Sequence, residues 1–104
     1  MKCKFLQPEE FSDHRGVIKS FYPDEAVVEY NLMTINKGSS RGFHYHPHFN
    51  EYMMVVHGEC IFTEFSDGNN VSHILKTGDS IKIPIGVAHS FEATTDMKFV
   101  SCLL

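Results

Sequence analysis

Histidine is the residue type with the clearest chemical potential in this chain. Seven of the 104 residues are histidine, and three of them fall between positions 44 and 48. Imidazole nitrogens bind first-row transition metals and also transfer protons near neutral pH. His44 and His46 are two residues apart, so an extended strand directs both side chains to the same face. Imidazoles about 7 Å apart along one strand can converge on a single ion.

Two further residues extend this pair to a set of four ligands. Pro47 is expected to end the strand and turn the chain back, so that the next strand brings Glu51 to the same centre. His89 follows a Gly-Asp turn and a Pro-Ile-Gly turn, and a strand across the fold can carry it to the site. Three imidazoles and one carboxylate suit one divalent ion of Mn, Fe, Co, Ni, Cu or Zn, and these residue types do not choose among them.

The other histidines and the cysteines are expected to have no part in this site. Pro47 disturbs the alternation that would turn His48 inward. His14, His57 and His73 lie near turns, where surface or hydrogen-bonding roles are usual. The three cysteines are an odd number without a C-x-x-C pair, which argues against a disulfide framework and a thiolate zinc site. They are interpreted as small buried hydrophobic residues.

Many short strands are needed to position these side chains. Segments rich in Val, Ile, Phe, Tyr and Thr alternate at close intervals with Gly, Pro, Asn and Asp, a pattern typical of an all-β sandwich or barrel. Residues 66–70 contain the Asp-Gly pair that hairpin turns prefer. Only residues 8–11 and 24–26 have the composition for a turn of helix. Strands are expected within 17–21, 27–35, 52–65, 71–75, 80–83 and 98–104.

Length and charge limit the classes of function. Residues 1–104 have the size of one domain, and the composition is that of an ordinary globular protein. The formal charge of −4 argues against a nucleic-acid partner, which requires clustered positive charge. No apolar run approaches the roughly 20 residues that span a bilayer, so no membrane association is expected. The N-terminus lacks the apolar segment of a secretory signal, and a cytoplasmic location is expected.

The spacing of these residues resembles the two sequence motifs of the cupin superfamily. The first motif, G-x(5)-H-x-H-x(4)-E-x(6)-G, matches at every fixed position between Gly38 and Gly58. The second, G-x(5)-P-x-G-x(2)-H-x(3)-N, matches from Gly78 to His89, and Ala93 replaces its final Asn. The resemblance implies an all-β, single-domain jelly-roll barrel, also called a double-stranded β-helix. It also implies that the metal ligands are His44, His46, Glu51 and His89, all pointing inward.

A finer resemblance concerns the cupins that act on nucleotide sugars. FSDHRG at residues 11–16 and NKGSSRGFHYH at residues 36–46 are similar to segments of deoxythymidine-diphosphate-sugar epimerases and 3,4-ketoisomerases. The resemblance implies a metal-binding isomerase or epimerase of a nucleotide-linked keto-sugar in surface-polysaccharide biosynthesis. Because both histidines and Glu51 are retained, the chain is most similar to the metal-binding members of this group.

Such a reaction removes a proton next to a carbonyl group, which a metal ion stabilises as a Lewis acid. If His44 and His46 bind metal, another residue must act as the base, and Tyr30 on the preceding strand is the candidate. Arg41 is positioned to bind a diphosphate through paired hydrogen bonds, although a solvated loop arginine or a structural ion pair is an equal alternative. Two other functions stay open, a metal-dependent small-molecule dioxygenase and a non-catalytic ligand-binding module. The resemblance also implies a homodimer formed through N-terminal strands.

Overall fold

The computed structural model describes the backbone of residues 1–104 and every side chain except that of Phe43. Described residues form strands and turns but no helix, so no helix is long and apolar enough to cross a membrane. In chain order the strands are β1 (Lys4–Phe5), β2 (Glu9–Asp13), β3 (Gly16–Ser20), β4 (Glu29–Ile35), β5 (Ser40–His44), β6 (Glu51–His57), β7 (Glu59–Ser66), β8 (Asn69–Lys76), β9 (Ser80–Ile83), β10 (Ala88–Ala93) and β11 (Met97–Leu103).

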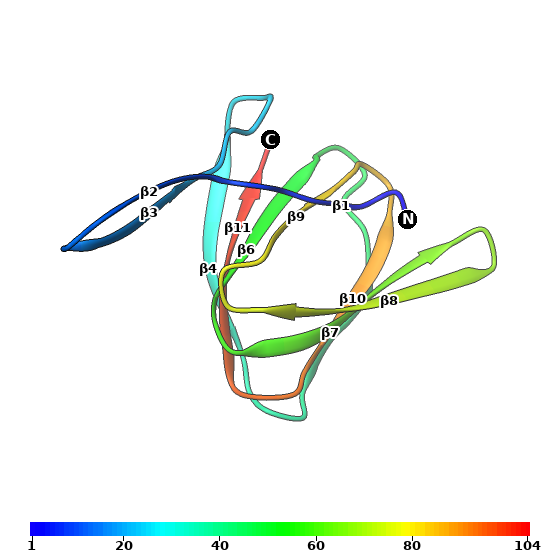
Figure 1. Ribbon diagram of the computed structural model, residues 1–104. Coiled ribbons are helices and arrows are strands. Elements are labelled where there is room, and N and C mark those ends of the chain that lie inside the picture. The colour runs from blue at the N-terminus through cyan, green and yellow to red at the C-terminus, as the bar shows by residue number, and fades with distance from the viewer.

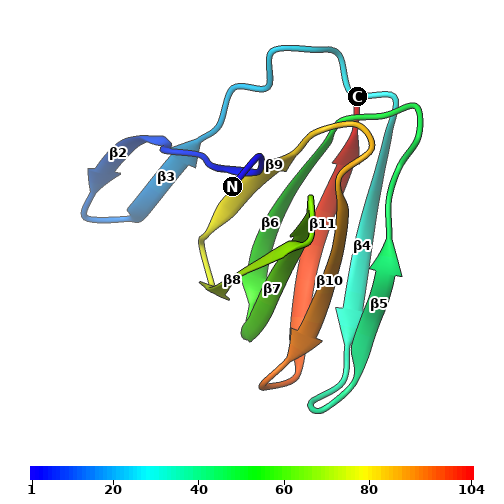
Figure 2. The same cartoon turned by 90° about the vertical axis from the view of Figure 1, so that its right-hand side faces the viewer.

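Two antiparallel sheets form the body of the molecule, and the all-β jelly-roll prediction is confirmed (Figures 1 and 2). The five-stranded sheet has the order β1-β9-β6-β11-β4, and the four-stranded sheet has the order β5-β10-β7-β8. Strands β2 and β3 pair only with each other and project away from this body as a separate hairpin (Figure 1).

The hydrophobic core lies between the two sheets and comes from the strict alternation of their strands. In β11, Met97, Phe99, Ser101 and Leu103 are buried, whereas Lys98, Val100 and Cys102 are more exposed. Phe62 and Phe91 pack in the core with ring centroids 5.3 Å apart, and Phe91 lies 5.3 Å from Phe99. The ring of His89 joins this cluster, with its centroid 6.0 Å from that of Phe62 and 5.4 Å from that of Phe91.

Local sequence signals locate most strands but misplace two elements. Residues 8–11 have the composition for a turn of helix, but residues 9–11 belong instead to strand β2, where Phe11 pairs with Ile18 of β3. Residues 52–65 do not form one strand, because Gly58 adopts φ +93° and separates β6 from β7. A left-handed φ of this kind favours glycine and allows the chain to pass from one sheet to the other.

The buried carboxylate of Glu64 attaches the N-terminal segment to the barrel. It accepts hydrogen bonds from the backbone N–H groups of Lys2, at 3.0 Å, and Cys3, at 2.8 Å. Burial of the Glu64 carboxyl acts to raise its pKa, but these two donors, the Cys3 thiol and the charge of the N-terminus together hold the pKa below the ordinary value. Because β7 belongs to the four-stranded sheet and the nearby β1 pairs with β9 of the other sheet, Glu64 ties the two sheets together.

Replacing Glu64 with glutamine is expected to lower the free energy of unfolding at pH 7 by about 1–3 kcal/mol, because the new amide group faces a buried backbone donor. The pKa of Glu64 is lower in the folded state, so its stabilisation is complete above the ordinary glutamate pKa of about 4.3 and is lost as the pH falls below it. Urea unfolding of both proteins between pH 3 and pH 7 measures this difference. If the difference in unfolding free energy between the two proteins stayed constant with pH, the charge of Glu64 would make no contribution to stability.

Candidate metal centre

Two adjacent strands of the four-stranded sheet place His44 and His89 side by side. His44 ends β5, His89 lies near the start of β10, and the two residues are direct partners in the antiparallel register. Direct partners point to the same face of a sheet, with their Cβ atoms about 5 Å apart. Their ring centroids are 4.2 Å apart.

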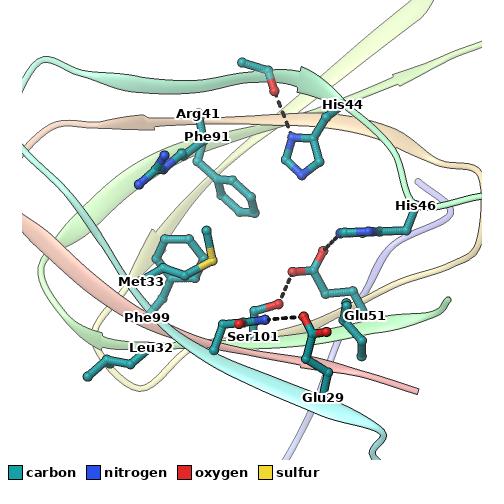
Figure 3. Close-up of a pocket in the computed structure, with 13 residues that line it drawn as sticks. Glu29, Leu32, Met33, Arg41, His44, His46, Glu51, Phe91, Phe99 and Ser101 are labelled. Carbon is teal, nitrogen blue, oxygen red and sulfur yellow. Dashed lines mark hydrogen bonds and ion pairs between the residues drawn. The ribbon is translucent and has the colours of Figure 1, made fainter.

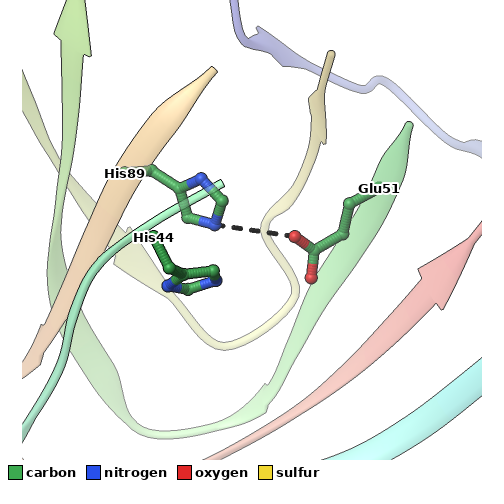
Figure 4. Close-up of side chains that lie close together, drawn as sticks. All are labelled: His44, Glu51 and His89. Carbon is green, nitrogen blue, oxygen red and sulfur yellow. Dashed lines mark ion pairs between the residues drawn. The ribbon is translucent and has the colours of Figure 1, made fainter. Parts of the chain in front are cut away.

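Glu51 reaches the same point from the opposite sheet, as the first residue of β6 (Figure 4). Its Oε1 atom lies 3.6 Å from Nε2 of His89. One ligand atom from each of His44, Glu51 and His89 lies within 4.8 Å of the others. Bonds of about 2.0–2.2 Å from a common ion would separate ligand atoms by about 3–4.4 Å, so these three residues need little movement to share one.

His46 lies beside this group but is not one of the three residues that cluster. It follows the end of β5 instead of continuing the strand, so the predicted extension of one strand through both histidines is wrong. The backbone N–H of Gly86 donates a hydrogen bond of 2.9 Å to the carbonyl of His46 and holds this loop in place. Nε2 of His46 lies 3.4 Å from Oε1 of Glu51, near enough for a fourth ligand.

Backbone carbonyl groups determine which ring nitrogen of two histidines is free. Nδ1 of His44 lies 2.9 Å from the carbonyl oxygen of Gly42, and Nδ1 of His89 lies 2.9 Å from that of Val87. A carbonyl oxygen only accepts hydrogen bonds, so both Nδ1 atoms carry the proton. In the neutral form of each ring, Nε2 then presents the lone pair, which is the usual arrangement of a metal-binding histidine.

Two buried acceptors of this group face each other without a donor. Among the described side chains, Oε1 of Glu51 and Nε2 of His89 are buried polar atoms that have no hydrogen-bond partner. Burial holds the pKa of His89 below its ordinary value, although the Val87 carbonyl and the Glu51 carboxylate act in the opposite direction. A neutral imidazole and a carboxylate at this distance repel through their lone pairs, and a bound cation would satisfy both. The donor set therefore fits a divalent transition metal.

A cavity of about 640 Å³ opens over this group (Figure 3). That volume is in the range of pockets for small organic ligands, about 300–1,000 Å³. The side chains that line it are Glu29, Asn31, Leu32, Met33, Arg41, His44, His46, Glu51, Phe91, Phe99, Ser101 and Leu103.

A β-bulge explains why Arg41 lines the same pocket as His44. The two residues are three apart, so a regular strand would point them to opposite faces. In the β5–β10 register, His89 pairs with His44 but Phe91 pairs with Arg41, which leaves one extra residue in β5. Bulges of this kind redirect side chains near functional sites. The guanidinium of Arg41 also donates a hydrogen bond of 3.2 Å to the carbonyl of Thr34.

Tyr30, the base expected from the sequence, lies outside the pocket. It is 78% exposed on β4 and does not line the cavity, whereas its neighbours Glu29 and Asn31 do. Alternation along β4 therefore directs the side chain of Tyr30 away from the pocket. Glu29 and Asn31 were missed, although both belong to the same alternating stripe as the core residue Ile35.

Comparisons with known proteins agree with this architecture. The family model for the cupin domain matches residues 31–103, and no curated protein matches the sequence significantly. The structure resembles a dTDP-6-deoxy-D-glucose-3,5-epimerase from Legionella pneumophila, at 22% identity and a TM-score of 0.81 over 97% of this chain. This chain spans 65% of the length of that epimerase.

Two further solved structures have the same fold. A 3,4-ketoisomerase from Helicobacter canadensis has a TM-score of 0.88 and 17% identity, covering 99% of this chain and 83% of its own. A dTDP-4-dehydrorhamnose 3,5-epimerase from Sulfolobus tokodaii has a TM-score of 0.85 and 22% identity, covering 100% of this chain and 70% of its own. At these identities the likeness establishes the fold. Because the family model covers residues 31–103 of the 104, the chain belongs to the cupin family.

Proposed function

We propose that this cupin binds one divalent transition metal through His44, His46, Glu51 and His89 and isomerises or epimerises a nucleotide-linked keto-sugar. The observation that carries the metal assignment is the pair of facing acceptors, Oε1 of Glu51 and Nε2 of His89, buried without a donor. The similar solved structures are sugar epimerases and a 3,4-ketoisomerase, and this likeness supports the substrate class. We place the reaction in the cytoplasm, in surface-polysaccharide biosynthesis.

The bound ion supplies Lewis acidity toward a carbonyl oxygen, which makes the neighbouring C–H group more acidic. The protein must then provide a base, and Glu29 is the carboxylate of the pocket that the ligand set does not use. Its Oε2 atom accepts a hydrogen bond of 3.0 Å from Nδ2 of Asn31, which orients the carboxylate at the pocket wall. Glu29 and Glu51 both pair with Leu103 of β11, so their backbones lie about 10 Å apart on either side of that strand.

Arg41 is the cation that lines the pocket, and we assign it to the diphosphate of the substrate. Its guanidinium is planar and always charged, and it can form two parallel hydrogen bonds with a phosphate group. The hydrogen bond to the Thr34 carbonyl uses one terminal nitrogen and fixes the direction of the side chain. The diphosphate would then extend along β5 while the sugar lies over the metal centre.

Exchange of the substrate proton with deuterated solvent tests this function directly. Metal-loaded protein incubated with a panel of dTDP-linked 4-keto-sugars is expected to incorporate deuterium beside the carbonyl, as followed by NMR. Glu29→Gln is expected to slow the exchange by about 10²–10⁴-fold, the usual contribution of a general base. Glu92→Gln, on the exposed face of β10, is the matched control. No exchange with any sugar would contradict the isomerase, and oxygen consumption by an iron-loaded sample would favour a dioxygenase.

We also propose that two copies of the chain associate through exposed apolar surfaces. Phe11 and Ile18, opposite each other in the β2–β3 hairpin, are 58% and 61% exposed. Tyr30 on the outer face of the edge strand β4 is 78% exposed. A two-stranded hairpin is marginally stable by itself, and apolar edges of sheets are normally covered. A second copy can cover both surfaces.

Sedimentation equilibrium is therefore expected to give a dimer for the parent protein. Replacing Phe11 and Ile18 together with serine is expected to produce monomer, because their apolar face is lost from the interface. Ile74→Ser, which changes an isoleucine of β8 that is 58% exposed, is the control and should leave the dimer intact. A parent protein that sediments as a monomer at all concentrations would rule out this assembly.

A further inference from the structure

Ser101 is a buried polar residue in a strand whose inward side is otherwise apolar. It is 3% exposed and follows Met97 and Phe99 on the inner face of β11, with Leu103 next along that face. A hydroxyl group in such a place requires a partner, since burial without one is costly. Its partner is the carboxylate of Glu51, which lies on the adjacent strand β6.

The two oxygens of Glu51 have different surroundings. The Ser101 hydroxyl donates a hydrogen bond to Oε2. Oε1 lies 3.4 Å from Nε2 of His46 and 3.6 Å from Nε2 of His89, and it has no hydrogen bond to any described residue. One oxygen is thus occupied by the protein, and the other faces the histidines (Figure 3).

We propose that Ser101 is a positioning residue that reserves Oε1 of Glu51 for the metal ion by binding Oε2. The hydroxyl prevents the carboxylate from rotating and from using both oxygens as ligands. It also compensates the desolvation of Oε2, which would otherwise be a second buried acceptor without a donor. Residues that support a ligand in this way typically change metal affinity by about 10–100-fold when they are replaced.

This inference rests on the proposed metal site, and its test separates the two. Zn²⁺ affinity is measured by competition with a chromophoric chelator, and the ligand field by the visible spectrum of Co²⁺-loaded protein. Ser101→Ala is expected to weaken Zn²⁺ binding by about 10–100-fold and to change the Co²⁺ spectrum as Glu51 reorients.

Ser80→Ala is the matched control. Ser80 is also buried in the five-stranded sheet, but its hydroxyl donates to the backbone carbonyl of Met53 at 2.9 Å, not to Glu51. This variant should keep the affinity and the Co²⁺ spectrum of the parent. If Ser101 had only a structural role, Ser101→Ala and Ser80→Ala would have the same Zn²⁺ affinity and the same Co²⁺ spectrum.

Ser101→Thr and Ser101→Val provide a second comparison, because their side chains have similar volumes and differ in the hydroxyl group. Threonine is expected to bind Zn²⁺ more tightly than valine by about 10-fold or more. Equal affinities in this pair, or an alanine variant with the parent's affinity and spectrum, would overturn the role of Ser101. A parent protein that binds neither ion would instead overturn the metal site itself.

Discussion

Replacing Glu51 with glutamine is expected to stabilise the metal-free protein while it destroys the metal site. Oε1 of Glu51 and Nε2 of His89 are buried acceptors that face each other at 3.6 Å without a donor. The amide nitrogen of glutamine can donate to His89, while the amide oxygen still accepts the hydrogen bond from Ser101. Satisfying one buried acceptor contributes about 1–3 kcal/mol, which raises the melting temperature by roughly 4 °C or more in a chain of this size.

The same substitution removes the only negative charge from the ligand set. Loss of a direct ligand is expected to weaken binding by more than the roughly 100-fold that loss of a supporting residue costs. Differential scanning calorimetry with and without added Zn²⁺ measures both effects, and the metal-dependent rise of the melting temperature should disappear. Glu92→Gln is again the charge-matched control, because Glu92 is exposed on β10. A metal-free variant less stable than the parent would show that His89 or His46 already supplies a proton to Glu51.

The largest effect on folding is expected from replacing Gly58 with alanine. Gly58 has φ +93°, and a Cβ atom there would lie 2.3 Å from the backbone oxygen of Asp96 and 2.9 Å from Cα of Met97. Backbone atoms cannot move aside as a flexible side chain does, so β6, β7 and β11 would have to separate where they meet. We expect a loss of more than about 4 kcal/mol and largely insoluble protein.

Gly68→Ala is the matched control for this prediction. Gly68 also has a left-handed φ, of +76°, but a Cβ atom there would meet nothing within 4 Å. Its replacement should cost about 1 kcal/mol of backbone strain. The two variants are compared by their soluble yield and by urea denaturation. Equal stability would contradict the prediction, because the backbone around Gly58 would then accommodate a Cβ atom at little cost.

Local signals in the sequence predict the all-β fold, and the spacing of two motifs predicts the residues of the candidate metal centre. Spacing places His44 and Glu51 on either side of one turn, and hairpin residues such as the Asp-Gly pair mark where strands reverse. Local signals did not predict the strand at residues 9–13. A hairpin that packs against no core has no clear alternation of hydrophobic and polar residues.

The pocket wall depends on register, which local signals do not reveal. Shifting a strand by one residue exchanges its two faces. The sequence therefore suggests Tyr30 for the pocket, whereas its neighbours Glu29 and Asn31 line the pocket wall. The bulge in β5 that turns Arg41 inward is set by pairing with β10, some fifty residues later in the chain. The sequence indicates Ser101 only weakly. It is the one polar residue between Phe99 and Leu103 on the inner face of β11.

Elemental analysis of purified protein beside its His89→Ala variant tests the central claim most directly. Both proteins are equilibrated with a metal mixture of Mn, Fe, Co, Ni, Cu and Zn and then desalted before mass spectrometry. The account predicts about one equivalent of a single transition metal in the parent and little or none in the variant, since His89 supplies one ligand of the set. Absence of every metal from the parent after this treatment would contradict the account.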